Sequence, residues 1–163
     1  RNVPLLAHLL FWYFAFPELL PEAAREVLYA NNPEAVCAVI ALSLYSGVHM
    51  AEDIRSGIRA VPPSQLEAAR SLVLMRGKSM RRVVLPQAFK IMPPSLINQF
   101  IITLKDTSLL SVLGFAELTY QGRIVIASTF RSFEIWLVVG VLYFIVIYLL
   151  TVLSNYVDKR FNK

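Results

Sequence analysis

The side chains that could do chemistry lie in three short polar stretches of an otherwise apolar chain. In the first, Ser46, His49 and Asp53 are spaced at i, i+3 and i+7, so in a helix they share one face. In the second, Lys105 and Asp106 are adjacent and are followed by Thr107-Ser108, between two apolar runs. Polar groups at membrane depth usually face the interior of a helix bundle or a water-filled path. For Ser46 and Gly47, packing between helices is the favoured explanation. Lys105-Asp106 forms either an intramembrane ion pair or an ordinary hydrophilic boundary.

The third stretch, residues 64–86, is basic and lies between two apolar runs. Pro62-Pro63 stop the preceding helix, because proline cannot continue one. Ser64 can then start a new helix, and Glu67 follows it at the spacing of a capping box. We expect this helix to end near Gly77, since glycine is common just past a helix terminus. The spacing leaves two roles open for Glu67, which either only caps the helix or also binds a partner.

The chain lacks the short motifs that mark common catalytic sites. The sequence contains no GxxxxGK[ST] phosphate-binding loop, no HExxH or CxxC pair and no GxSxG elbow. The single cysteine, Cys37, excludes an intrachain disulfide and is expected to pack as a small apolar side chain. His8 stands alone in an apolar run, where a hydrogen-bonding role is more common than metal binding. We expect no catalytic residue, no metal site and no cofactor on this chain.

The composition indicates a membrane protein. Of the 163 residues, 56% are hydrophobic and only 17% are charged, and the mean hydropathy is +0.56. Soluble domains carry about 25% charged residues. The charge-free runs predict an all-α bundle of about four membrane segments, at about 3–17, 35–58, 88–113 and 133–157. The last run is long enough to cross a bilayer alone, which takes about 20 residues.

The charge distribution predicts the orientation of the chain. Eight cations lie between Arg55 and Lys90, and only Glu67 opposes them, whereas residues 18–34 contain four acids and one arginine. Because Lys and Arg accumulate on the cytoplasmic side of membrane proteins, residues 60–86 and the C-terminus are expected to be cytoplasmic. Nucleic-acid binding is a poor explanation for these cations, since they lack interleaved aromatic residues and lie between membrane segments.

Several stretches resemble one transporter family. Glu67-Ala68-Ala69, followed by Leu85-Pro86, is similar to the EAA loop of permease subunits of bacterial ATP-binding-cassette (ABC) importers, and more narrowly of the polar-amino-acid family. Residues 1–6, 41–47, 82–89 and 104–109 are also similar, so the resemblance covers essentially the whole chain. It implies that residues 1–163 form a partial transmembrane domain, with a first helix missing and with a cytoplasmic EAA coupling helix.

The sequence departs from this family at two positions. Val73 stands where the family usually has a glycine, which permits a tight bend in the loop, and His49 stands where a tyrosine is common. The fine geometry of the loop around Val73 therefore does not follow from the resemblance.

The resemblance implies a multi-pass permease of the bacterial cytoplasmic (inner) membrane for ATP-driven import of amino acids, with a slight preference for acidic ones. Its implied partners are a dimer of cytoplasmic ABC ATPase subunits that hold ATP and Mg, a second permease subunit in a homo- or heterodimer, a periplasmic or lipid-anchored amino-acid-binding protein, and membrane lipid. No nucleic acid is expected. The alternative to an ATP-driven permease is a secondary transporter or a channel. A non-transporting membrane scaffold is a third class, but it would not explain the polar stretches.

The expected site residues form two groups. Those of the EAA loop are expected to couple to the ATPase, and they are Glu67, Ala68, Ala69, Arg70, Val73, Leu85 and Pro86. Those expected along the translocation path are Ser46, His49, Glu52, Asn98, Lys105 and Asp106. Glu52 has a second explanation as half of an ion pair with Arg55 or Arg59.

Overall fold

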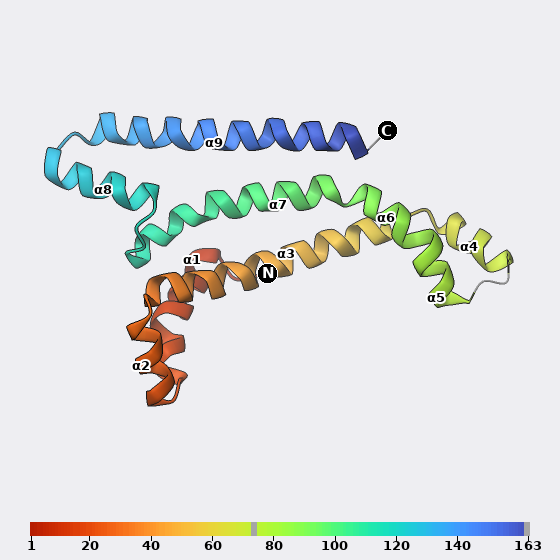
Figure 1. The fold of residues 1–163 in the computed structure, drawn as a ribbon, viewed down its shortest axis with the longest axis horizontal. Coiled ribbons are helices and arrows are strands. Elements are labelled where there is room, and N and C mark those ends of the chain that lie inside the picture. Colours follow the sequence, from red (N-terminus) through yellow and green to blue (C-terminus); the bar gives the residue numbers. More distant parts are fainter. Residues whose placement is uncertain (73–74, 162–163) are drawn as a thin grey trace.

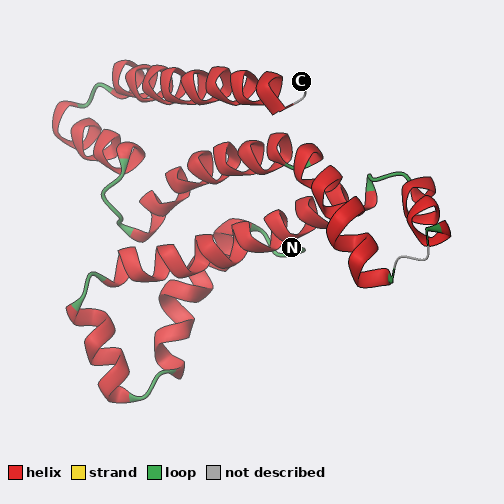
Figure 2. Cartoon of the chain, turned by 45° about the vertical axis from the view of Figure 1, so that its right-hand side comes forward, coloured by secondary structure: helices red, strands yellow, loops and turns green. Residues whose placement is uncertain are grey.

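The computed structural model describes residues 1–72 and 75–161, and the regular elements in these ranges are all helical (Figure 2). Among them, three helical stretches have the length and hydropathy of a membrane span, namely Pro33–Arg59, Pro93–Leu113 and Ser132–Tyr156. A shorter apolar helical stretch covers Leu5–Leu19. The predicted all-helical membrane bundle is confirmed.

The helices follow one another with short connections. In chain order they are α1 (Leu5–Leu10), α2 (Glu22–Ala30), α3 (Pro33–Arg59), α4 (Pro63–Ser71), α5 (Arg76–Ser79), α6 (Leu85–Ile91), α7 (Pro93–Asp106), α8 (Leu118–Thr129) and α9 (Ser132–Phe161). Wider π turns at Phe11–Ala15 and Met80–Val84, and tighter 3-10 turns at Phe16–Leu19 and Thr107–Leu113, continue several of them.

The three long helices α3, α7 and α9 run along the long axis of the molecule, with α7 packed against both of the others (Figure 1). Helices α4 to α6 form one end of the molecule, and α2 and α8 lie toward the other (Figure 1). The two ends therefore hold different connections, and the long helices join them.

Two apolar clusters fix α3 near its two ends. The first, here called the α1 cluster, joins α1 and α3 to the 3-10 turn after α7 through Leu5, Leu9, Ala38, Ala41, Leu110 and Leu113. The second, here called the α4 cluster, consists of Val61, Val84, Ala88 and Met92, with the partly buried Ile58, Leu66 and Leu96 packed against it. Because Ile58 belongs to α3, Leu66 to α4 and Ala88 to α6, the α4 cluster packs these three helices against one another.

Helix α4 begins before the residue that the sequence indicated. Pro62 precedes the helix, Pro63 occupies its first position, and the Gln65 amide donates to the Pro62 carbonyl at 3.0 Å. No side-chain cap is found on this described helix, so the predicted Ser64–Glu67 capping box is wrong. The physical reason is that proline suits the first helical position, where its fixed φ fits and its missing N–H costs nothing.

The end of α4 also differs from the prediction. Ser71 is its last residue, and Gly77 lies inside α5 instead of ending the helix. The proline pair at 93–94 does coincide with a break, because α6 ends at Ile91 and α7 begins at Pro93. There the two prolines occupy the first turn of a new helix, which tolerates them.

Candidate functional site

Helix α4 turns its apolar side toward the protein and its charged side toward the surface. Leu66 packs against the α4 cluster and Ala69 is only 3% exposed, because positions three apart share one face of a helix. Glu67, Ala68 and Arg70 are exposed. The EAA triplet is therefore split, with Ala69 holding the helix to the protein and Glu67 and Ala68 open to a partner.

Behind α4, α3 approaches the α6–α7 junction so closely that only glycine fits. A Cβ placed on Gly57 would overlap Cγ of Met92, and Met92 is 3% exposed within the α4 cluster. No similar contact exists at Gly47, where a Cβ would meet nothing within 4 Å. Gly57 is thus required for this junction, whereas Gly47 is not.

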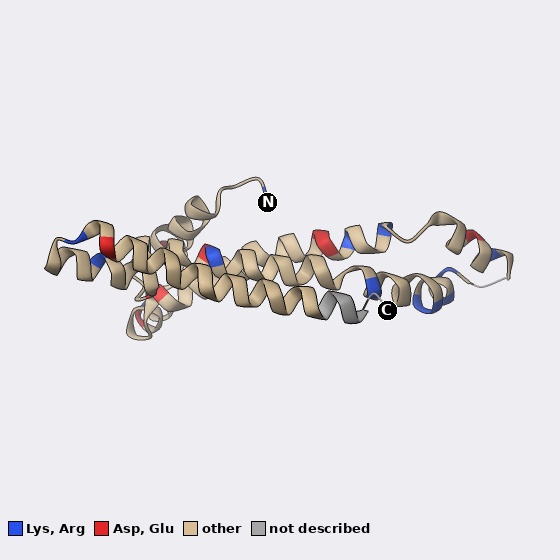
Figure 3. Cartoon of the chain, turned by 90° about the horizontal axis from the view of Figure 1, so that it is seen from above, with Lys and Arg blue, Asp and Glu red and all other residues tan. Residues whose placement is uncertain are grey.

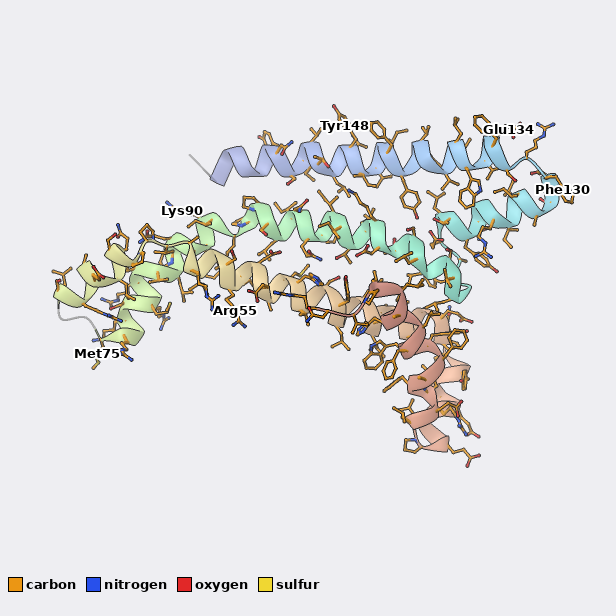
Figure 4. All side chains as sticks on the ribbon, turned by 180° about the vertical axis from the view of Figure 1, so that it is seen from behind. Arg55, Met75, Lys90, Phe130, Glu134 and Tyr148 are labelled. Atoms are coloured by element: carbon orange, nitrogen blue, oxygen red, sulfur yellow. The ribbon has the colours of Figure 1, made fainter. Side chains whose placement is uncertain are left out.

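Positive charge gathers at the α4 end of the molecule (Figure 3). All eight cations from Arg55 to Lys90 are exposed. Within the described residues, Arg55 is the one of the eight that forms an ion pair, with Glu52 at 3.4 Å. In Figure 4, Arg55 and Lys90 lie toward this end, and Phe130 and Glu134 lie toward the other. A broad cationic surface therefore surrounds α4.

Leu85 and Pro86, the other described residues of the EAA loop, lie in α6 and not in α4. Leu85 is half-buried and Pro86 is exposed, and together they start α6, which follows the Met80–Val84 turn without a gap. They lie between Val84 and Ala88 of the α4 cluster in the chain and are not part of the exposed face of α4. Val73 lies outside the described residues.

Of the predicted path residues, Ser46 takes part in a contact that joins two helices, whereas His49 contacts its own helix. The Ser46 hydroxyl of α3 lies 2.8 Å from that of Thr103 on α7, and Thr103 also donates to the Gln99 carbonyl at 2.9 Å. Ser46 is only 6% exposed, so this hydrogen bond is an interhelical packing contact of the kind expected between membrane helices. His49 Nδ1 lies 2.9 Å from the Tyr45 carbonyl in its own helix.

Of the two alternatives for Lys105 and Asp106, the structure does not form the ion pair. Lys105 is exposed, Asp106 is half-buried, and no salt bridge joins them among the described residues. Adjacent residues on a helix point about 100° apart, so they do not face each other. Asp106 lies three residues after Thr103, whose hydroxyl contacts Ser46 of α3, so the two residues share the face of α7 that faces α3.

The other two path candidates lie nearer the surface. Glu52 is held by Arg55, as the alternative explanation proposed, and by Arg1 at 3.8 Å. Asn98 is exposed on α7, next to the buried Gln99. Within the part of the chain that the structure describes, no group of three or more His, Cys, Asp or Glu could hold a metal ion.

The predictions for His8 and Cys37 agree with the structure. The Trp12 indole donates to His8 Nε2 at 3.1 Å, so His8 serves as a hydrogen-bonding side chain. Cys37 is 1% exposed and packs within the protein.

Sequence reasoning missed polar residues that join helices, among them Thr103, Glu117 and Tyr143. Thr103 and Asp106 share a face of α7 at i and i+3, so their spacing could have revealed Thr103. The hydrogen bond between Tyr143 and Glu117 joins residues far apart in the chain, and no local signal predicts it.

The whole chain, residues 1–163, matches the family described as "Binding-protein-dependent transport system inner membrane component". It is 36% identical to the probable amino-acid ABC transporter permease protein PatM of Vibrio harveyi, over 100% of this chain and 70% of that protein. It is 36% identical to the glutamine transport system permease protein GlnP of Escherichia coli strain K12, over 98% of this chain and 70% of that protein.

A solved structure is also similar. The crystal structure of an amino acid ABC transporter with histidines superposes with a TM-score of 0.86 at 36% identity, and the match covers 98% of this chain and 71% of that chain. Sequence and fold therefore agree on the same relatives.

Proposed function

This chain belongs to the family of binding-protein-dependent transport system inner membrane components, and from that premise we propose how its helices serve transport. It is a membrane permease subunit of an ATP-driven amino-acid import system, and thus a transport component rather than an enzyme. Such a permease works in the inner membrane with an ATPase and a substrate-binding partner. The secondary transporter or channel considered from the sequence is not favoured.

Helix α4 is the proposed contact with the ATPase. The observation that carries this proposal is its two-sided character, with Leu66 and Ala69 packed on the α4 cluster and Glu67 and Arg70 exposed. The exposed face would dock in a groove of one subunit of an ATPase dimer, where ATP and Mg bind. Ala68 leaves room for close approach, and the two charged side chains would pair with opposite charges of the ATPase.

The packing behind α4 supports a rigid-body coupling mechanism. A movement of α4 presses on Val84 and Met92, and through Met92 on Gly57 of α3. Because these side chains are closely packed, α3 and the α6–α7 junction would shift together when the ATPase closes. That shift would alternate the access of the path between the two sides of the membrane.

The cationic end of the molecule is proposed to be cytoplasmic, together with the C-terminus after α9. We expect Ser64→Cys, in a Cys37→Ala background, to react with a membrane-impermeant thiol reagent only in inside-out vesicles. Ser128→Cys on α8 should react only from the opposite side. The reversed pattern, or protection of Ser64→Cys from both sides in the absence of the ATPase, would contradict this orientation.

The proposed path follows the polar side chains on α3 and α7. Asp106 is half-buried and shares the α3-facing side of α7 with Thr103, and a carboxylate there would attract the ammonium group of an amino acid. Ser46, Asn98 and the exposed Lys105 complete the set on these helices, and Glu52 lies toward the cationic end. Thr103 joins Ser46 across the same seam.

Asp106→Asn is expected to reduce amino-acid uptake by the reconstituted complex by about tenfold, because losing a charged hydrogen-bonding contact costs about 1.5–3 kcal/mol. Membrane insertion and assembly should not change. Glu134→Gln, a carboxylate-to-amide change at an exposed position, serves as the control and should transport like the wild type. Uptake by Asp106→Asn at the wild-type rate would remove Asp106 from the path.

Further partners follow from the surfaces that the chain leaves open. Only 6% of the most apolar stretch of α9 is buried within the chain. We propose that membrane lipid and a second, identical or related permease subunit cover the rest. A periplasmic or lipid-anchored binding protein would deliver the amino acid at the end of the molecule that holds α2 and α8. Acidic amino acids are the slightly preferred class of substrate, on the resemblance alone.

A further inference from the structure

Helix α8 is bounded by two residues with left-handed backbone conformations. Gly114 precedes it with φ of +86°, and Phe130 ends it with φ of +58°. Glycine adopts this conformation without strain, whereas a phenylalanine does so at a cost. The chain therefore bends sharply on both sides of α8.

Those contacts begin at one carboxylate. Glu117 precedes the first residue of α8 and accepts hydrogen bonds from the amides of Thr119 at 2.8 Å and Tyr120 at 2.6 Å, so it caps the helix. The Tyr143 hydroxyl on α9 donates to the same carboxylate at 2.8 Å and lies 3.2 Å from the Thr119 hydroxyl. The cap of one helix is thus tied to the side of another.

This carboxylate is half-buried, and its partner Tyr143 lies well within the length of α9. Tyr143 is about three turns from Ser132, or about 16 Å along the helix axis. A carboxylate at such depth in a membrane protein is unfavourable unless its oxygens are satisfied. The two backbone amides and the Tyr143 hydroxyl satisfy both oxygens of Glu117.

Helix α8 packs against both α9 and the 3-10 turn after α7. A Cβ placed on Gly122 would lie 2.9 Å from Val139 Cγ2, so the two helices are in direct backbone-to-side-chain contact. Toward the 3-10 turn after α7, Arg123 Nη1 donates to the Ser111 carbonyl at 3.4 Å, and Arg123 is exposed. The contacts of the Tyr143 hydroxyl on α9 with Glu117 and Thr119 are shorter, at 2.8 and 3.2 Å.

We propose that Tyr143 and Glu117 form a clamp that fixes α8 to α9, so that the two helices move as one body about the bend at Gly114. Tyr143 is then a positioning residue, acting through the helix cap and not through contact with the transported solute. The part of this proposal that concerns movement rests on the ATP-driven function proposed above. The clamp itself does not depend on that function.

The first experiment measures the clamp without transport. In the assembled complex, Tyr143→Phe removes the hydroxyl and is expected to speed hydrogen–deuterium exchange of the peptide covering residues 117–121 by about tenfold. Tyr148→Phe is the matched control, because Tyr148 is 58% exposed on the same helix and stacks on Phe144 (Figure 4). It should leave that exchange unchanged. Equal exchange in Tyr143→Phe and the wild type would overturn the clamp.

The second experiment measures movement with spin labels in a Cys37→Ala background. One pair joins Ser128 to the exposed Leu137 of α9, and the other joins Ser128 to the exposed Val112 after α7. Between the nucleotide-free and vanadate-trapped complexes, we expect the first distance to stay constant and the second to change. With Tyr143→Phe, the first distance should also change.

The spin-label distances separate a failure of the joint movement from a failure of the ATP-driven function. A first distance that changes in the wild type as much as the second would overturn the joint movement of α8 and α9. If neither distance changes with nucleotide, nor a reference distance between α4 and α9, the ATP-driven function fails, and the exchange experiment still decides the clamp.

Discussion

Glu67→Ala is expected to reduce ATP-driven uptake at least tenfold in a complex that still inserts in the membrane. Glu67 is exposed on α4, and no ion pair or side-chain cap holds it within the described residues, so its removal should not unfold the helix. Truncating one member of a charge pair that becomes buried at an interface costs about 2–5 kcal/mol, which exceeds a tenfold effect. The measurement is uptake per ATP hydrolysed in proteoliposomes.

The matched control for this change is Glu26→Ala, which removes an exposed glutamate from α2 at the other end of the molecule. It should leave the ratio of uptake to hydrolysis unchanged. A loss of ATPase binding by Glu67→Ala would also support docking at α4. Coupling at the wild-type ratio in Glu67→Ala would exclude the role that we propose for this carboxylate.

Gly57→Ala is expected to destabilise the junction behind α4. The added Cβ overlaps Met92, whose own exposure of 3% leaves it little room to move. Overpacking of this kind costs about 1–3 kcal/mol, which corresponds to a fall of about 5 °C in the unfolding midpoint of a domain of this size. Uptake should fall as well, because the displaced Met92 disturbs the contact by which α4 moves α3.

Gly47→Ala tests whether the loss of stability expected for Gly57→Ala comes from the contact of Gly57 with Met92. Gly47 lies in the same helix with nothing near its Cβ position, and alanine favours a helix by about 1 kcal/mol over glycine. Its unfolding midpoint should stay the same or rise. An equal loss of stability in the two variants would show that α3 simply requires glycine and that the Met92 contact has no special role.

The sequence was sufficient to place most helices, because the signals that define a membrane helix are local. The predicted segment 133–157 falls within α9, and 35–58 falls within α3, since long charge-free apolar runs with charged or proline-bounded ends leave few alternatives. The cationic surface around α4 could also be predicted, because exposed positions are the usual place for Lys and Arg.

The helix start at α4 shows how a local rule failed. Ser64 and Glu67 fit a capping box, but Pro63 fits the first helical position better, so the helix started before the serine. Two local signals competed here, and their spacing alone did not decide between them.

By itself, the sequence determined that the chain is a bundle of apolar helices with a basic, proline-bounded helix at one end. Only the tertiary structure decided which polar groups meet, such as Ser46 with Thr103 and Tyr143 with Glu117. The same holds for the contact of Gly57 with Met92. The physical reason is that hydropathy and turn residues fix where a helix begins and ends, whereas contacts between helices depend on how each helix is rotated and tilted against its neighbours, which only their mutual packing sets.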